Sequence, residues 1–192
     1  MRAPTHVVAD RADRTAFAII AGMTGVLGLL TLAEGVWRTI ALARGDGAVE
    51  LLATGDVVGN LGVVTSATVA SDALSDGPRT LLVVASALGV VISTAVYVAI
   101  VAFLVSTARG TPFDRHLFPV VLTTGALMST GGILAGGLDG LGRMMAGGEL
   151  GAPYEAAFEL EFGSWAFGFV VLVAAYVIRA GQRLQRDTEG LV

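Results

Sequence analysis

Residues 81–107 read LLVVASALGVVISTAVYVAIVAFLVST, and this stretch decides the fold of the chain. It contains no charged side chain. At roughly 1.5 Å of helical rise per residue, it is longer than the roughly 30 Å hydrocarbon core of a bilayer. The chain has 192 residues, of which 54% are hydrophobic, and a mean hydropathy of +0.76. This hydropathy is too high for an ordinary soluble domain and indicates an integral membrane protein.

Three further apolar runs are long enough to cross a membrane, and none carries a charge near its centre. The sequence therefore predicts an all-α integral membrane fold, a four-helix transmembrane bundle, with spans at about 16–43, 81–107, 112–145 and 162–182. These spans define a membrane domain of residues 16–182, with outer loops at 44–80 and 146–161, an N-terminal segment at 1–15 and a tail at 183–192.

The distribution of arginine predicts the orientation. The chain has twelve basic residues, all of them Arg, and eight lie in the N-terminal segment, the 108–116 loop and the region from residue 179 onwards. Cytoplasmic loops of membrane proteins carry an excess of basic residues. A composition rich in Ala, Gly and Val without Lys is typical of a GC-rich bacterial genome. We expect a multi-pass protein of the bacterial inner membrane with both termini cytoplasmic.

The sequence STARGTPFDRH at residues 106–116 predicts a tight turn between the second and third spans. Gly110 suits the end of the second helix, Thr111 is a candidate N-cap, and Pro112 suits the first helical position. Asp114 then falls where a capping-box acid would reach back. We expect the third helix to begin near residue 112 and to lie antiparallel beside the second.

The outer loops are expected to form a small extracytoplasmic cap. Loop 44–80 is rich in Val and Thr, and Gly59–Asn60 suits a hairpin turn. In the second loop, FELEF at 158–162 alternates apolar and acidic residues with the period of a strand. A small β-element from both loops and an amphipathic segment lying on the headgroups are equally favoured interpretations.

Two five-residue motifs repeat one pattern of acid, Gly, two residues and Arg: EGVWR at 34–38 and DGLGR at 139–143. The i, i+4 spacing places each acid and Arg on one helix face, and helical rise places both pairs near the outer membrane boundary. If the first and third helices are adjacent, Glu34 meets Arg143 and Asp139 meets Arg38. The favoured interpretation of this rim charge network is a structural clamp, and the alternative is a site for an ion or an outer ligand.

Small residues recur every fourth position on two predicted helices, which favours close helix packing within the bundle over a dimer interface. The two stripes are Ala85, Gly89 and Ser93 on the second span and Gly132, Gly136 and Gly140 on the third.

The sequence does not favour catalysis, a metal or cofactor site, or nucleic-acid binding. Without Cys there is no disulfide or thiolate chemistry, and no nucleophile–base set is recognisable, so we expect no enzymatic activity. Glu155, Glu159 and Glu161 fit a solvated loop face better than a weak cation site. We expect no resident metal, no cofactor and no direct binding of nucleic acid, because the basic segments are short and juxtamembrane. Contact with membrane lipid headgroups suits those segments better.

The turn RGTPFDR at 109–115 and the tail RAGQRLQRDTEGLV at 179–192 resemble the bacterial four-span membrane family called domain of unknown function 2975. The positions that carry the resemblance are Gly110, Pro112, Phe113, Gly181, Leu184, Asp187 and Glu189. The family has no established activity, so the resemblance transfers no catalytic residue. Because some members are encoded beside a small helix-turn-helix regulator, it implies a membrane partner of such a regulator.

These observations predict a non-enzymatic integral membrane protein that acts through protein partners, as a membrane regulator or an accessory subunit. The candidate partner-binding residues lie in the cytoplasmic turn and tail: Arg109, Pro112, Phe113, Arg115, Arg183, Leu184 and Arg186. The alternatives are an oligomeric small transporter or channel and a membrane immunity protein against a toxin.

Overall fold

A computed structural model describes residues 11–54, 64–111, 113–151, 154, 156, 158 and 162–189. It is mostly helical, and four of its helices are long and apolar enough to cross a membrane, which confirms the predicted fold class. The elements are α1 (Arg11–Arg44), β1 (Ala48–Thr54), β2 (Val64–Ala70), a 3-10 turn η1 (Ser71–Ala73), α2 (Asp76–Ala108), α3 (Leu117–Ala126), a π-helical segment η2 (Leu127–Gly131), α4 (Gly132–Leu150) and α5 (Phe162–Glu189). Segments α3, η2 and α4 run on continuously as the third membrane-length helix.

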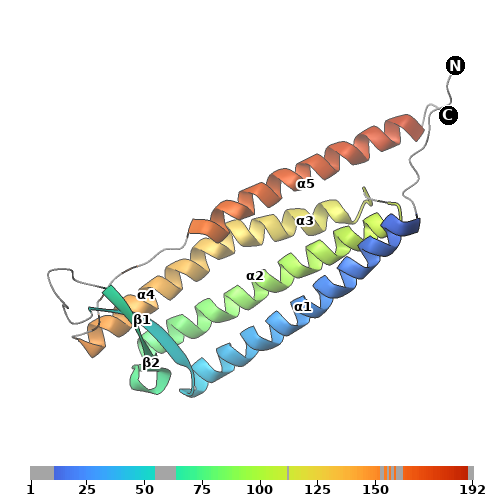
Figure 1. Cartoon of the computed structure of the whole chain (residues 1–192). Helices are drawn as coiled ribbons and strands as arrows, with labels where there is room; N and C mark the ends of the chain where they lie inside the picture. Colours follow the sequence, from blue (N-terminus) through green and yellow to red (C-terminus); the bar gives the residue numbers. More distant parts are fainter. Residues whose placement is uncertain are drawn as a thin grey trace.

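The helices lie side by side in a row, with α2 between α1 and α4 (Figure 1). Helix α1 packs along α2, α2 packs along α4, and α3 packs along α5. The expectation that the second and third helices are neighbours is therefore confirmed. We call the end that carries β1 and β2 the hairpin end, and the opposite end, which carries residues 109–116, the turn end.

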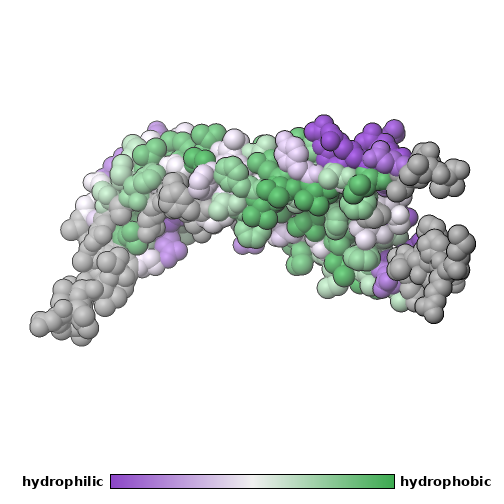
Figure 2. All heavy atoms as spheres, turned by 90° about the horizontal axis from the view of Figure 1, so that it is seen from above, coloured by the Kyte–Doolittle hydropathy of each residue, from purple (hydrophilic) through white to green (hydrophobic). Residues whose placement is uncertain are grey.

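The helix surfaces that face outward are apolar. On α1, Met23 is 63% exposed, Leu29 67% and Trp37 71%. Exposed apolar area on this scale indicates a surface that another apolar phase covers, and a bilayer supplies that phase for helices of this length. Figure 2 shows the hydrophobic surface along the helices, with hydrophilic side chains gathered over the C-terminal part of α5. The structure is thus consistent with a multi-pass membrane protein.

Helix α2 ends as the sequence predicts, at Gly110. This residue has a φ of 78°, its amide donates to the Thr107 carbonyl at 3.0 Å, and the Thr111 amide donates to the Ser106 carbonyl at 2.9 Å. The two bonds form a Schellman motif, in which a residue without a Cβ is favoured at the left-handed position.

The predicted start of the third helix is wrong, because the helix begins at Leu117 and not near residue 112. The Asp114 carboxylate accepts a hydrogen bond from the His116 amide at 2.9 Å, and the Leu117 amide donates to the Asp114 carbonyl at 3.0 Å. Asp114 therefore closes a local turn ahead of the helix, a competing bond that Asp side chains make readily. Pro112 lies outside the described residues.

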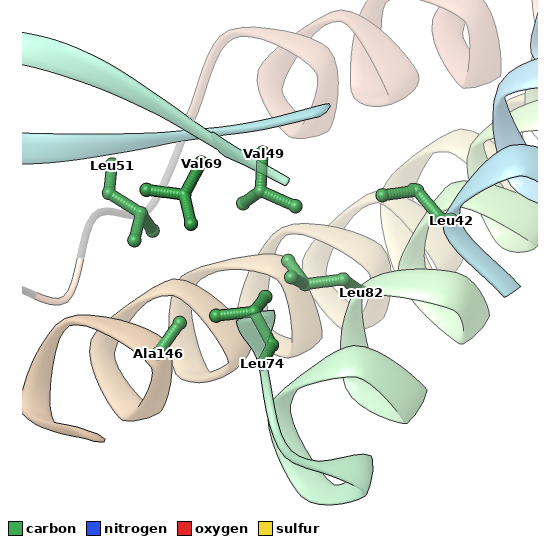
Figure 3. Packing of buried hydrophobic residues seen from close by; sticks show 7 residues of the cluster. All are labelled: Leu42, Val49, Leu51, Val69, Leu74, Leu82 and Ala146. Carbon is green, nitrogen blue, oxygen red and sulfur yellow. The ribbon is translucent and has the colours of Figure 1, made fainter. Parts of the chain in front are cut away.

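The predicted cap exists as an antiparallel hairpin of β1 and β2, with a register from Ala48↔Ala70 to Thr54↔Val64. Val49 and Leu51 of β1 and Val69 of β2 are buried at alternate positions of the strands, as expected for a sheet with one buried face. Figure 3 shows the three hairpin side chains in one buried cluster with side chains of α1, α2, α4 and the segment before α2; its members are Leu42, Val49, Leu51, Val69, Leu74, Leu82 and Ala146.

Both strands of this hairpin come from the first outer loop, and in the second outer loop Tyr154 is a β-bridge residue. The predicted turn at Gly59–Asn60 lies outside the described residues, as do residues 159–161 of the predicted second-loop strand. Phe162 belongs to α5, and Tyr154 is the second-loop residue that packs partly buried against the cluster under the hairpin.

Candidate functional site

The second copy of the repeated motif forms its ion pair within α4. Arg143 Nε lies 2.6 Å from Asp139 Oδ2, four residues earlier. The Arg143 Nη1 atom donates a second bond of 2.5 Å to the Glu50 carbonyl of β1. Arg143 therefore fastens the hairpin to α4, and the pair predicted from i, i+4 spacing is confirmed.

The first copy of the motif behaves differently. Glu34 and Arg38 are exposed on α1, and neither makes a hydrogen bond or ion pair with any other residue that the structure describes. The predicted pairs Glu34–Arg143 and Asp139–Arg38 are wrong, because α2 lies between α1 and α4 and separates the two motifs. The spacing within a helix is visible in the sequence, whereas the order of helices in the row is not.

Arg38, Asp139 and Arg143 nevertheless line one groove of about 1020 Å³. Its floor is α2, its walls are α1 and α4, and β1 lines it at the hairpin end. Glu34 is not among its lining residues. The groove-lining residues that belong to the two predicted small-residue stripes are Ala85, Gly89, Ser93, Gly132 and Gly136. A Cβ built at Gly89 would have no atom within 4 Å. These small residues therefore widen a groove as well as allowing helices to approach.

Most groove hydroxyls already have partners. Thr31 Oγ1 and Tyr97 Oη are 3.2 Å apart and join α1 to α2. Ser86 Oγ lies 2.8 Å from Thr39 Oγ1 and joins the same two helices nearer the hairpin end. Pairing lowers the cost of keeping hydroxyl groups in an apolar setting. The charged groups of the groove lining are Arg38, Asp139 and Arg143.

A second candidate site lies at the turn end, where the predicted turn and tail residues meet. The Phe113 ring packs on Gly181, so closely that a Cβ at Gly181 would lie 2.5 Å from Phe113 Cε1. One residue further along α5, Gln182 Nε2 donates to the Asp114 carbonyl at 2.7 Å. Two segments that are far apart in the sequence thus form one surface, the turn–tail surface of residues 109–111, 113–116 and 179–187.

The turn–tail surface combines apolar and basic side chains. Leu184 is 67% exposed and Phe113 is 40% exposed. The predicted site arginines Arg109, Arg115, Arg183 and Arg186 are all exposed. A hollow of about 370 Å³ lies on α5, lined by Arg179, Arg183, Arg186 and Asp187. This is the hydrophilic end of α5 in Figure 2.

Sequence reasoning missed Arg179 and Gln182 as members of this surface. Arg179 lies with its guanidinium carbon 5.1 Å from the centre of the Phe118 ring, a cation–π contact that ties α5 to α3. The spacing of Arg179, Arg183 and Arg186 at i, i+4 and i, i+7 places them on one helix face and could have indicated Arg179.

No family model, curated protein or solved structure matches this chain. Within the described part of the chain, no group of three or more His, Asp or Glu side chains is placed to hold a metal ion.

Proposed function

We propose that this chain is a non-enzymatic protein of the bacterial inner membrane that binds a cytoplasmic protein partner, as a membrane regulator or an accessory subunit. The observation that carries the proposal is the meeting of turn and tail, in which Phe113 packs on Gly181 and Gln182 bonds to Asp114. A surface built from two distant segments has a fixed shape that a partner can recognise, which a single exposed tail would lack.

The side chains of the turn–tail surface suit a protein partner. Exposed Leu184 and Phe113 offer apolar contact area on it. Arginine is enriched in protein interfaces, and the arginines that line the hollow on α5 favour an acidic partner surface. By the resemblance to domain of unknown function 2975, a small helix-turn-helix regulator is the class of partner that we propose. The membrane protein would then contact the regulator, while DNA recognition would belong to the regulator.

Site-specific photo-crosslinking in cells tests this proposal. A photoreactive amino acid in place of Leu184 should give a discrete protein adduct. The matched control is Val177, which is 61% exposed on α5 and lies one heptad earlier on the same helix face. At Val177 the expected adducts are to lipid. Identical adducts at both positions, or lipid adducts alone at Leu184, would contradict the proposal.

A second measurement tests the role of charge. Arg183→Glu combined with Arg186→Glu should abolish the Leu184 adduct, because both arginines line the hollow on α5 and their replacement reverses the charge that this part of the turn–tail surface offers to an acidic partner. Arg79→Glu is the matched control, because Arg79 lies at the hairpin end and pairs with Asp76. An adduct that survives the double charge reversal would remove the basic side chains from the proposed interface.

A further inference from the structure

The groove between α1, α2 and α4 has the length of one membrane leaflet. Along α1 its lining runs from Leu42 at the hairpin end to Gly28. These fourteen helical steps correspond to about 21 Å. Half of a bilayer, headgroups included, measures about 20–22 Å. The groove therefore extends from the headgroup level on the hairpin side to about the middle of the membrane.

The charges of the groove gather at its headgroup end. Arg38 is exposed and has no partner among the described residues. Arg143 lies across the groove from it, with Nε and Nη1 engaged by Asp139 and Glu50. Two arginines and one aspartate give the lining a net charge of +1. Arginine binds phosphate with particular strength through its planar set of donors.

The remainder of the groove suits an acyl chain. Ala85, Gly89, Gly132 and Gly136 present small apolar surfaces. The hydroxyls of Thr31 and Tyr97 bond to each other across the α1–α2 contact. An acyl chain neither donates nor accepts hydrogen bonds, and these two hydroxyl groups do not need a bond from it because they are already paired.

We propose that this groove binds one phospholipid from the leaflet on the hairpin side. Its phosphate lies between Arg38 and Arg143, and its acyl chains run along the floor of α2 towards Tyr97. The phosphate balances the charge that Asp139 leaves uncompensated. This site is separate from the turn–tail surface and is independent of the proposed partner binding.

Native mass spectrometry of the full chain in detergent tests the proposal. Dioleoyl phosphatidylglycerol should bind with one tight site, and dioleoylglycerol, which has the same chains and no phosphate, should bind at least tenfold more weakly. Arg38→Ala should weaken phosphatidylglycerol binding about tenfold, as expected for one charge-assisted hydrogen bond. Arg79→Ala, which removes an arginine of the hairpin end that does not line the groove, should leave binding unchanged.

Two glycine variants test the location. Gly89→Leu places a large side chain in the open space of the groove and should abolish the tight site. Gly137→Leu is the matched control, because Gly137 has equally open surroundings and does not line the groove. If Gly89→Leu does not elute as one species on gel filtration, the Arg38→Ala and Arg79→Ala pair decides the result.

Three outcomes would overturn the proposal. The first is equal binding of phosphatidylglycerol and dioleoylglycerol. The second is an unchanged tight site in Gly89→Leu, or equal effects of Arg38→Ala and Arg79→Ala. The third is a wild-type dimer that Gly89→Leu disperses, which would assign the groove to a second copy of the chain.

Discussion

Gly168 is the residue at which α5 comes closest to the π-helical segment. A Cβ at this position would lie 2.6 Å from the Ser129 backbone nitrogen and 3.0 Å from the Met128 carbonyl carbon. Backbone atoms cannot turn away as a flexible side chain can. Any larger residue must therefore move α5 away from its neighbour.

Gly168→Ala is expected to destabilise the protein by about 1–3 kcal/mol, the usual range for an overpacked contact. Gly163→Ala on the same helix is the control, because no atom lies within 4 Å of a Cβ built there. It should be neutral or gain up to about 1 kcal/mol of helix propensity. Thermal unfolding in detergent compares the two variants, and equal melting temperatures would show that the close contact does not limit packing.

The repeated acid–Arg motif gives a second prediction for single residues. Glu34→Arg should change stability by less than about 0.5 kcal/mol, because the exposed Glu34 carboxylate has no partner among the described residues. Arg143→Glu should cost about 2 kcal/mol, because Arg143 bonds to both Asp139 and the Glu50 carbonyl.

The double variant that combines Glu34→Arg with Arg143→Glu should be as unstable as Arg143→Glu alone. Thermal unfolding in detergent measures the stability of all three variants. A double variant that regains wild-type stability would mean that Glu34 and Arg143 do pair across the row of helices.

Local patterns at the residue scale could be predicted from the sequence. The Asp139–Arg143 pair and the helix end at Gly110 depend on residues within five positions of one another. The role of Gly168 could not be predicted, because it depends on which helices are neighbours. The contact of Phe113 with Gly181 joins two motifs that are far apart in the sequence.

Among the elements, the π-helical segment η2 explains why the third membrane-length helix has two different neighbours. Its backbone inserts one residue into the helical repeat, and one residue corresponds to about 100° of rotation. As a result, the third membrane-length helix packs mainly on α5 along α3 and mainly on α2 along α4. Ser129 is buried in this segment and donates to the Gly125 carbonyl at 2.8 Å. The sequence offered no signal for it, because LMSTG fits an ordinary helix equally well.

Ser71, which follows β2 and is completely buried, bonds with Gly47, the residue before β1. The Gly47 amide donates to Ser71 Oγ at 3.1 Å, and the Ser71 amide donates to the Gly47 carbonyl at 2.7 Å. Ser71→Ala would leave the Gly47 amide unpaired in a buried position and should cost about 1–3 kcal/mol.

Hydrogen exchange of the β1 and β2 amides, followed by mass spectrometry, measures the local effect of Ser71→Ala. Ser66→Ala is the control, because Ser66 is exposed on β2. Equal exchange in both variants would show that the Ser71 hydroxyl does not stabilise the hairpin.

Across the whole molecule, the orientation proposed from the arginines can be tested with introduced cysteines, since the chain has none of its own. Thr68→Cys lies exposed on the hairpin, and Thr111→Cys lies exposed on the turn. In spheroplasts, a membrane-impermeant maleimide should label the first variant at once and the second only after permeabilisation. Labelling in the opposite order would invert the proposed topology.

The number of spans could be predicted, because hydropathy is a property of single segments. The hairpin of β1 and β2 corresponds to one of two equally favoured interpretations of the outer loops, and the strand period at 158–162 did not indicate it. The row of helices and its groove could not be predicted. Lipid tails are as apolar as Leu or Val, so hydropathy does not distinguish a side chain that faces lipid from one that faces another helix. The choice of neighbours depends on shape, as at Gly28, where a Cβ would lie 2.8 Å from Tyr97 Cγ.

The row has a consequence for biosynthesis. Each membrane-length helix packs mainly on the one that precedes it in the chain: α2 on α1, α4 on α2, and α5 on α3. As each span after the first leaves the translocon, the helix on which it mainly packs is already in the bilayer. Assembly can then follow synthesis step by step.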